Sequence, residues 1–309
     1  MNAPTVTPAA VAALSEAPFV VYRSGAAPRS PLVFASPHSG RHYPPDMMAA
    51  SLLDSSAIRL SEDAYVDELI RGAVGHGATV IAAAYARAYI DVNREPYELD
   101  ASMFEDELPD FARGRSARVA AGLGSIARIV AEGHEIYSRK LTFADARRRI
   151  EQVHRPYHDA LAGLLAGARA AFGLAVLVDW HSMPAAAART YGQSGDTGGR
   201  AGVSGAGVCD LVLGDRFGTA CAPQVTALVE RELEAMGYRV ARNAPYAGGY
   251  TTEFYGKPST RTHALQIEIN RALYLDEARL EPGEGFGRLK TDLERVFAAL
   301  AEGTARGFA

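Results

Sequence analysis

Several features that would place this chain in a special class are scarce or missing. Of its 309 residues only two are cysteines, Cys209 and Cys221, which is too few for a disulfide framework and favours reduced thiols. No apolar run approaches the ~20 residues that span a bilayer, and no positively charged segment followed by an apolar core marks a secretory leader. We therefore expect a cytoplasmic protein that does not associate with a membrane.

Strong charge of one sign is also missing. The net charge is −4, and there is no long basic run. Proteins that bind nucleic acid carry basic patches that neutralise phosphates, so the composition argues against nucleic acid as the main partner. A hydrophobic fraction of 48% and a charged fraction of 22% are ordinary for a globular enzyme. A small molecule is therefore the expected partner, and the oligomeric state is left open.

What the sequence does contain is an alternation of strand-like and helix-like segments. Short apolar runs predict strands at 32–36, 78–84, 174–180, 209–213, 238–242 and 264–270, with an edge strand at 19–22 and an extended run at 87–92. Helical patterns cover 55–74, 124–172, 222–236 and 288–302, and Pro156 should kink or split the second of these. This alternation predicts an α/β fold, a three-layer sandwich with a mixed, largely parallel central sheet.

The segments between these elements complete the predicted organisation. Residues 1–17 are expected to form a loose arm, and residues 192–207, which include seven glycines, a mobile loop. A further glycine- and aromatic-rich loop is expected at 246–256. Neither an internal repeat nor a linker divides the chain, so we expect a single catalytic domain over residues 1–309.

Two predicted strands each deliver a histidine at or just beyond their ends. His38 follows the run 32–36, and His181 follows the run 174–180. Open α/β sheets bind ligands beyond the carboxyl ends of their strands, so the two imidazoles are placed to converge on a metal ion or to serve the structure alone. Asp179 lies two residues before His181, on the same face of an extended segment, where it could orient an imidazole or pair with a backbone amide.

A hydrolytic zinc site needs three protein ligands and one open position. Glu62 and Asp63 lie on the predicted helix that follows the first strand, from which they can fold back toward the His38 loop. Helix carboxylates are also commonly just solvated. Spacing alone therefore leaves both acids as candidates for the third ligand.

Glu268 is the most informative acid. In the run 265–270 the side chains of Leu265, Ile267 and Ile269 face one way. Glu268 faces the other way, between Gln266 and Asn270. Burying an unpaired carboxylate is costly, so Glu268 either pairs with an arginine such as Arg271 or Arg94, or lines a cleft as a general base.

Two further pairs could bind a substrate. Asn93 and Arg94 place an amide beside a guanidinium in a turn before Pro96, which suits capture of a carboxylate or a local salt bridge. His154 and His158 stand four residues apart, a spacing that can bind metal on a helix. The glutamate of the usual zinc motif is absent between them, which favours a structural role or a substrate contact.

Taken together, six short motifs resemble the N-formylglutamate amidohydrolase family over about residues 31–275. These are Ser36-Pro-His-Ser-Gly40, Asp91-Val-Asn-Arg94, His154-Arg-Pro-Tyr-His158, Asp179-Trp-His-Ser182, Gly248-Gly-Tyr250 and Gln266-Ile-Glu-Ile-Asn270. The resemblance implies a fold similar to zinc carboxypeptidases and aspartoacylases. It also implies one Zn²⁺, or another divalent metal, held by His38, His181 and Asp63, with Glu62 as the alternative to Asp63.

The same resemblance implies roles for the remaining residues. Glu268 becomes the general base, and Asn93, Arg94, Tyr250 and Thr251 become substrate contacts. The implied reaction is metal-dependent hydrolysis of the linear amide of an N-acyl amino acid. The expected substrate is N-formyl-L-glutamate, which yields formate and L-glutamate during histidine degradation.

The sequence departs from the pattern of these relatives at two points. Arg41 stands three residues after His38, where the carboxypeptidase-like relatives have a glutamate, and Glu253 is an acid close to the expected anion-binding loop. The alternatives are therefore a carboxypeptidase-like or cyclic-amide hydrolase acting on another carboxylate, and a metal-free binding protein on the same scaffold. A pocket with one fixed arginine rather than two would favour the different substrate.

Overall fold

The computed structural model describes residues 16–130, 133–188 and 209–307. At its centre is a seven-stranded sheet with the order β1-β3-β2-β4-β7-β5-β6. The strands are β1 (Phe19–Tyr22), β2 (Leu32–Ser36), β3 (Thr79–Ala83), β4 (Ala175–Met183), β5 (Leu211–Gly214), β6 (Val240–Arg242) and β7 (Thr262–Asn270). Strands β3, β2, β4 and β7 run parallel, whereas β1 and β5 pair antiparallel with β3 and β7. The predicted mixed, largely parallel sheet is confirmed.

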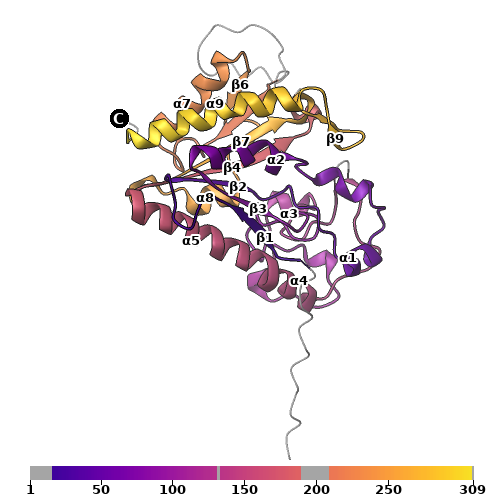
Figure 1. Cartoon of the computed structure of the whole chain (residues 1–309). Coiled ribbons are helices and arrows are strands. Elements are labelled where there is room, and N and C mark those ends of the chain that lie inside the picture. The colour runs from indigo at the N-terminus through magenta and orange to yellow at the C-terminus, as the bar shows by residue number, and fades with distance from the viewer. Residues whose placement is uncertain (1–15, 131–132, 189–208, 308–309) are drawn as a thin grey trace, which may run out of the picture.

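Helices cover both faces of this sheet (Figure 1). One face carries α2 (Val66–Ile70), α7 (Pro223–Ala235) and α9 (Phe286–Ala305), and the other carries α5 (Arg155–Phe172). Strand alternation sorts the core, since Phe34 packs on the α9 side while Val33 packs on the α5 side. The rings of Phe34, Trp180 and Phe297 meet with centroids 5.4–5.8 Å apart. The three-layer sandwich is therefore as predicted.

Shorter elements complete the described chain. The helical ones are α1 (Pro45–Ala50), η1 (Ala57–Ser61), η2 (Arg71–His76), η3 (Ala101–Met103), η4 (Asp110–Ala112), α3 (Ala117–Ala120), α4 (Phe143–Arg149), the π-helix η6 (Ile150–His154), α8 (Tyr250–Tyr255), η7 (Pro258–Thr260) and η8 (Arg271–Leu273). Strands β8 (Leu275–Asp276) and β9 (Glu281–Pro282) form a separate small sheet.

The helix predicted at 55–74 is broken into η1, α2 and η2, so the prediction of one continuous element was wrong. Between η1 and α2 the chain is extended at Glu62, and Tyr65 adopts a left-handed conformation with φ of 62°. Such a conformation costs about 1–3 kcal/mol in a non-glycine residue. It is held because the backbone N–H of Asp63 donates to the carbonyl of His38 at 3.0 Å. A tertiary contact thus overrides the local helical pattern.

Four further expectations need correction. The extended run at 87–92 does not form a strand, because residues 87–89 and 92–93 are in turns. The helix predicted over 124–172 begins only at Phe143, where Thr142 and Asp145 form a reciprocal capping box. Pro156 lies at the start of α5, directly after the π-helix, and the helical path continues through it. The loop predicted at 246–256 contains the short helix α8.

Some expectations concern residues outside the described ranges. Most of the predicted arm at 1–17 and the whole of the glycine-rich segment 192–207 belong to them. Both cysteines are described, and each is a buried free thiol, as predicted. Within the described part of the chain, every helix is too short or too polar to cross a membrane.

Candidate metal centre and active site

Two adjacent parallel strands carry the acidic and imidazole groups of the site. In the register of β4 and β7, His181 is opposite Glu268 and Asp179 is opposite Gln266. Alternation places all four side chains on the face that α5 covers farther down the strands. The sequence expectation that His181 follows the strand was wrong, because β4 continues to Met183. The predicted polar face of β7 is confirmed.

His38 reaches the same place from the loop after β2. This loop runs close under Tyr85, since a Cβ on Gly40 would lie 2.2 Å from the Tyr85 carbonyl oxygen. The hydroxyl of Ser39 donates to the carbonyl of Asp63 at 3.0 Å, which adds to the His38–Asp63 backbone bond. Two segments 25 residues apart in sequence are thus fixed side by side.

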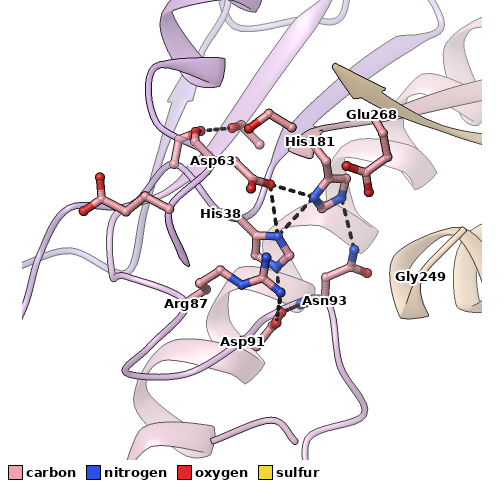
Figure 2. A network of polar contacts seen from close by, with 12 residues as sticks. His38, Asp63, Arg87, Asp91, Asn93, His181, Gly249 and Glu268 are labelled. Carbon is pink, nitrogen blue, oxygen red and sulfur yellow. Dashed lines mark hydrogen bonds and ion pairs between the residues drawn. The ribbon is translucent and has the colours of Figure 1, made fainter. Parts of the chain in front are cut away.

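Three ligand-type atoms converge at this point (Figure 2). The Nδ1 atoms of His38 and His181 lie 3.0 Å apart, and Oδ2 of Asp63 lies 3.3 Å from the first and 3.1 Å from the second. All three residues are buried, and one ligand atom from each lies within 4.8 Å of the others. This is a compact three-ligand set of the type that binds a divalent metal ion.

In the rings of His38 and His181, the partner of Nε2 determines which nitrogen carries the proton. Nε2 of His38 lies 2.7 Å from Asp91, and Nε2 of His181 lies 3.0 Å from Asp179. Because a carboxylate accepts a hydrogen bond, each neutral ring carries its proton on Nε2 and turns a lone pair on Nδ1 toward Asp63. Two nitrogen lone pairs and a carboxylate that face one another repel, and a cation between them would remove this repulsion. The donor set therefore fits a metal cation.

The electrostatics of the cluster point the same way. Burial alone would raise the pKa of Asp63, yet the neighbouring imidazoles of His181 and His38 hold that pKa well below its usual range. Burial alone would lower the pKa of His181, but Asp179 and Asp63 raise it well above its ordinary value. The buried acids thus create a field that favours positive charge at His181. Either a proton or a metal ion can supply this positive charge.

Glu62 and Asp63 are adjacent but point in different directions. Both carboxylate oxygens of Glu62 accept hydrogen bonds from Arg59, at 3.0 and 3.1 Å, and Tyr43 donates to Glu62 at 2.8 Å. Asp63 instead faces the histidines with one oxygen and Arg271 with the other, at 3.2 Å. The geometry therefore favours Asp63 over Glu62 as the candidate third ligand.

We expect Asp63→Asn to weaken metal binding strongly, whereas Glu62→Gln leaves it near wild type. The first change removes a charged ligand atom, and the second removes only a salt bridge and so lowers thermal stability. Metal content after dialysis and melting temperature on the same samples measure both effects. Loss of metal in Glu62→Gln with full occupancy in Asp63→Asn would reverse the assignment.

Glu268 lies beside this cluster and lines the cavity. Gln266 donates to its Oε1 at 2.8 Å, and Arg271 pairs with Asp63 instead of with Glu268. Burial raises the pKa of Glu268 to about 7, with Asp63 adding to the shift and His181 opposing it. A carboxyl group with a pKa near neutrality can both accept and return a proton, which is what a general acid–base residue needs.

The cavity above the cluster has a volume of about 630 Å³ and is lined by His38, Asp63, Arg87, Asp91, Asn93, Arg94, Arg118, His181, Arg216, Gln266, Glu268 and Arg271, among others. Of these arginines, Arg87 pairs with Asp91 at 2.7 Å, and Arg271 and Arg216 also have carboxylate partners. Within the described residues, Arg94 and Arg118 form no salt bridge with a carboxylate.

The predicted substrate contacts occupy different positions. Asn93 and Arg94 line the cavity, and the guanidinium of Arg94 donates to the carbonyls of Asn93 and Leu123. Tyr250 lines a neighbouring pocket instead, and Thr251 is fully buried with its backbone N–H donating to Asn93. Asn93 and Arg94 therefore line the cavity, whereas Tyr250 and Thr251 do not.

Sequence reasoning missed two members of the site. Asp91 orients His38, and Arg87 in turn holds Asp91. The signal was present, since Asp91 belongs to a motif that was singled out for Asn93 and Arg94 and Arg87 stands four residues before it. Arg271 was considered as a salt-bridge partner of Glu268, but it donates to Asp63 instead. Contacts between distant segments decide these pairings.

The fold and the site together define an α/β protein with a candidate metal centre beside a buried carboxyl group. A model of the family described as N-formylglutamate amidohydrolase matches residues 30–275. The chain belongs to this family, as its motifs predict. It is 29% identical over 252 residues to the N-formylglutamate deformylases of Pseudomonas putida and Pseudomonas aeruginosa, covering 81% of this chain and 83% and 84% of theirs.

Solved structures agree with this placement. The crystal structure of N-formylglutamate amidohydrolase from Ralstonia eutropha JMP134 is 38% identical with a TM-score of 0.85, covering 94% of this chain and all of that one. A gene product of Agrobacterium tumefaciens, 16% identical with a TM-score of 0.61, shares the fold over 95% of this chain and 97% of its own. Membership of an amidohydrolase family confirms the predicted enzyme class, a hydrolase acting on a linear amide.

Proposed function

We propose that this protein hydrolyses N-formyl-L-glutamate to formate and L-glutamate, with one zinc ion per chain, in the cytoplasm and as part of histidine degradation. The observation that carries the proposal is the convergence of His38, His181 and Asp63 beside Glu268, in a cavity with arginines. The names of the deformylase relatives supply the substrate.

In this proposal His38, His181 and Asp63 hold the metal ion. A bound divalent cation would supply a Lewis acid that polarises the formyl carbonyl and lowers the pKa of water. Asp91 and Asp179 keep the two rings in the tautomer that presents Nδ1. Arg271 holds Asp63 in place through its second oxygen. The surrounding contacts therefore fix the orientation of each ligand before substrate arrives.

Glu268 moves the proton in the reaction that we propose. It takes a proton from the attacking water and gives it to the nitrogen of the departing amine, so that the carboxylate is restored at the end of the cycle. The hydrogen bond from Gln266 to Oε1 fixes the orientation of the carboxyl group. The positive charge of Arg87, which lines the same cavity, would stabilise the oxyanion of the tetrahedral intermediate.

The arginines of the cavity support a substrate with two carboxylates. Arg94 and Arg118 line it and form no salt bridge with a carboxylate in the described chain, so two guanidinium groups remain for substrate anions. Glu253, which stood as an objection, pairs with Arg216 at 2.9 Å and does not reach the cavity lining. These contacts favour a dianion such as N-formylglutamate over a substrate with one carboxylate.

We expect Arg94→Lys to raise KM for N-formyl-L-glutamate by about tenfold or more, the size of one lost charge-assisted hydrogen bond. Lysine keeps the charge but loses the planar fork, so kcat should also fall through misorientation of the substrate. Steady-state kinetics measure both. Arg128→Lys is the matched control, because Arg128 pairs with Asp100 outside this cavity. An unchanged KM in Arg94→Lys would remove Arg94 from the binding site.

The proposed function is tested by formate release. The purified protein, stripped of metal and then loaded with Zn²⁺, should release formate from N-formyl-L-glutamate far faster than from N-formyl-L-methionine, which has a single carboxylate. Stripped protein should be inactive and should recover with metal. Equal rates on both substrates would assign the chain to a different carboxylate substrate. A failure to bind metal or to turn over any amide would favour the metal-free binding protein.

A further inference from the structure

The turn that carries Asn93 and Arg94 is held by side chains. No backbone–backbone hydrogen bond within the described chain involves residues 92–94. The N–H of Asn93 donates to Oδ1 of Asp91 at 2.8 Å, and its carbonyl accepts from Arg94 at 3.0 Å. The carbonyls on either side of Asn93, those of Val92 and Arg94, accept from two histidines. The shape of this turn therefore depends on those histidines.

These histidines are His154 and His158, which the proposed reaction leaves without a role. Nε2 of His158 lies 2.7 Å from the carbonyl oxygen of Val92, and Nε2 of His154 lies 2.9 Å from that of Arg94. The two rings stack with centroids 4.4 Å apart. Their spacing of four residues places them on one face of the helix, so both can reach the turn. The π-helix Ile150–His154 ends at the first of them.

Both rings are built to donate from Nε2. A carbonyl only accepts, so the ring proton must lie on Nε2 in each case. The hydroxyl of Tyr255, which donates to the backbone carbonyl of His158 at 3.2 Å, also lies 2.9 Å from Nδ1 of His158. Burial lowers the pKa of His158 to about 3 and also lowers the pKa of His154, so both rings are neutral donors at neutral pH.

The turn itself sits where small displacements matter. The amide oxygen of Asn93 accepts from the N–H of Thr251 at 2.8 Å, and its nitrogen lies 3.1 Å from Nε2 of His181. Gly249 faces Asn93 so closely that a Cβ there would lie 2.7 Å from the amide nitrogen. Arg94 follows directly and lines the cavity. A shift of this turn would move both the carboxylate-binding arginine and the contact with His181.

We propose that His154 and His158 are positioning residues that clamp the Asn93–Arg94 turn from both sides and so set the geometry for substrate binding. Neither ring belongs to the converging set of His38, Asp63 and His181. The proposal rests on the proposed function for its kinetic readout. A misplacement of about 1 Å in a positioning group can lower a rate by about 10²-fold.

The experiment compares alanine and glutamine at each histidine in the zinc-loaded protein. His158→Ala and His154→Ala should each lower kcat/KM for N-formyl-L-glutamate by about 10- to 10²-fold, with KM raised and zinc content unchanged. Glutamine places its Nε2 about where the histidine Nε2 lies, so His158→Gln and His154→Gln should recover most of the activity. A role in stability alone would lower the melting temperature in both series without this difference.

A double-mutant cycle tests whether the histidines act through the turn. Adding His158→Ala to Asn93→Ala should cost far less than His158→Ala costs alone, because the residue it positions is already removed. His76→Ala is the control, since His76 contacts Glu294 on the other side of the sheet and should leave kcat/KM unchanged. Alanine variants with wild-type kcat/KM, or effects that add fully with Asn93→Ala, would overturn the clamp. Absence of turnover in the wild type would instead overturn the proposed function.

Discussion

His38→Ala and His181→Ala should each reduce bound zinc to well below one equivalent and abolish measurable formate release. Each removes one of three converging ligand atoms, and the Nδ1 atoms of the two rings lie only 3.0 Å apart. Loss of a residue that merely orients a ligand typically costs 10- to 100-fold in metal affinity, so loss of a ligand should cost more. Metal analysis after dialysis and titration with Zn²⁺ measure the effect.

The control for this prediction is His263→Ala. His263 stands on β7 near the end opposite Glu268 and accepts a hydrogen bond from the backbone of Ala222. Its loss should leave metal content and turnover at wild-type values. Full stoichiometric zinc in both His38→Ala and His181→Ala would contradict the ligand assignment, whatever the activity of the variants.

Glu268→Gln should lower kcat by about 10²–10⁴, the usual contribution of a positioned acid–base group, while metal content stays near wild type. Glutamine keeps the shape of the side chain and removes only its ability to exchange a proton. Glu268 is buried beside the ligands, yet it does not belong to the converging set of His38, Asp63 and His181. Zinc content, melting temperature and kcat measured on one preparation separate chemistry from structure.

The pH dependence gives a second readout for Glu268. A general base must be deprotonated to act, so kcat/KM of the wild type should fall as the pH drops through the pKa of Glu268. Burial raises that pKa to about 7, and a bound cation would lower it, so the acidic limb should lie at or below pH 7. The residual activity of Glu268→Gln should lack this limb. A stable, zinc-loaded Glu268→Gln protein with near-normal turnover would end the proposed mechanism.

The sequence by itself determined the sheet and the positions of its main polar groups. The apolar runs at 32–36 and 174–178 and the alternating run at 264–270 predicted three central strands. The alternation in β7 placed Glu268 on the polar side, and the break in apolar pattern at Asp179 and His181 marked the site. These features are local, since they depend on the two-residue period of a strand.

Tertiary structure alone decided how those groups pair. The local pattern placed Glu62 and Asp63 on one helix as equal candidates, whereas the fold breaks that helix and turns only Asp63 toward the histidines. Asp91 meets His38 across 53 positions of the chain, and Arg271 reaches Asp63 across 208. Hydrogen bonds of this kind depend on how separate elements pack, and neither periodicity nor spacing within one segment encodes them.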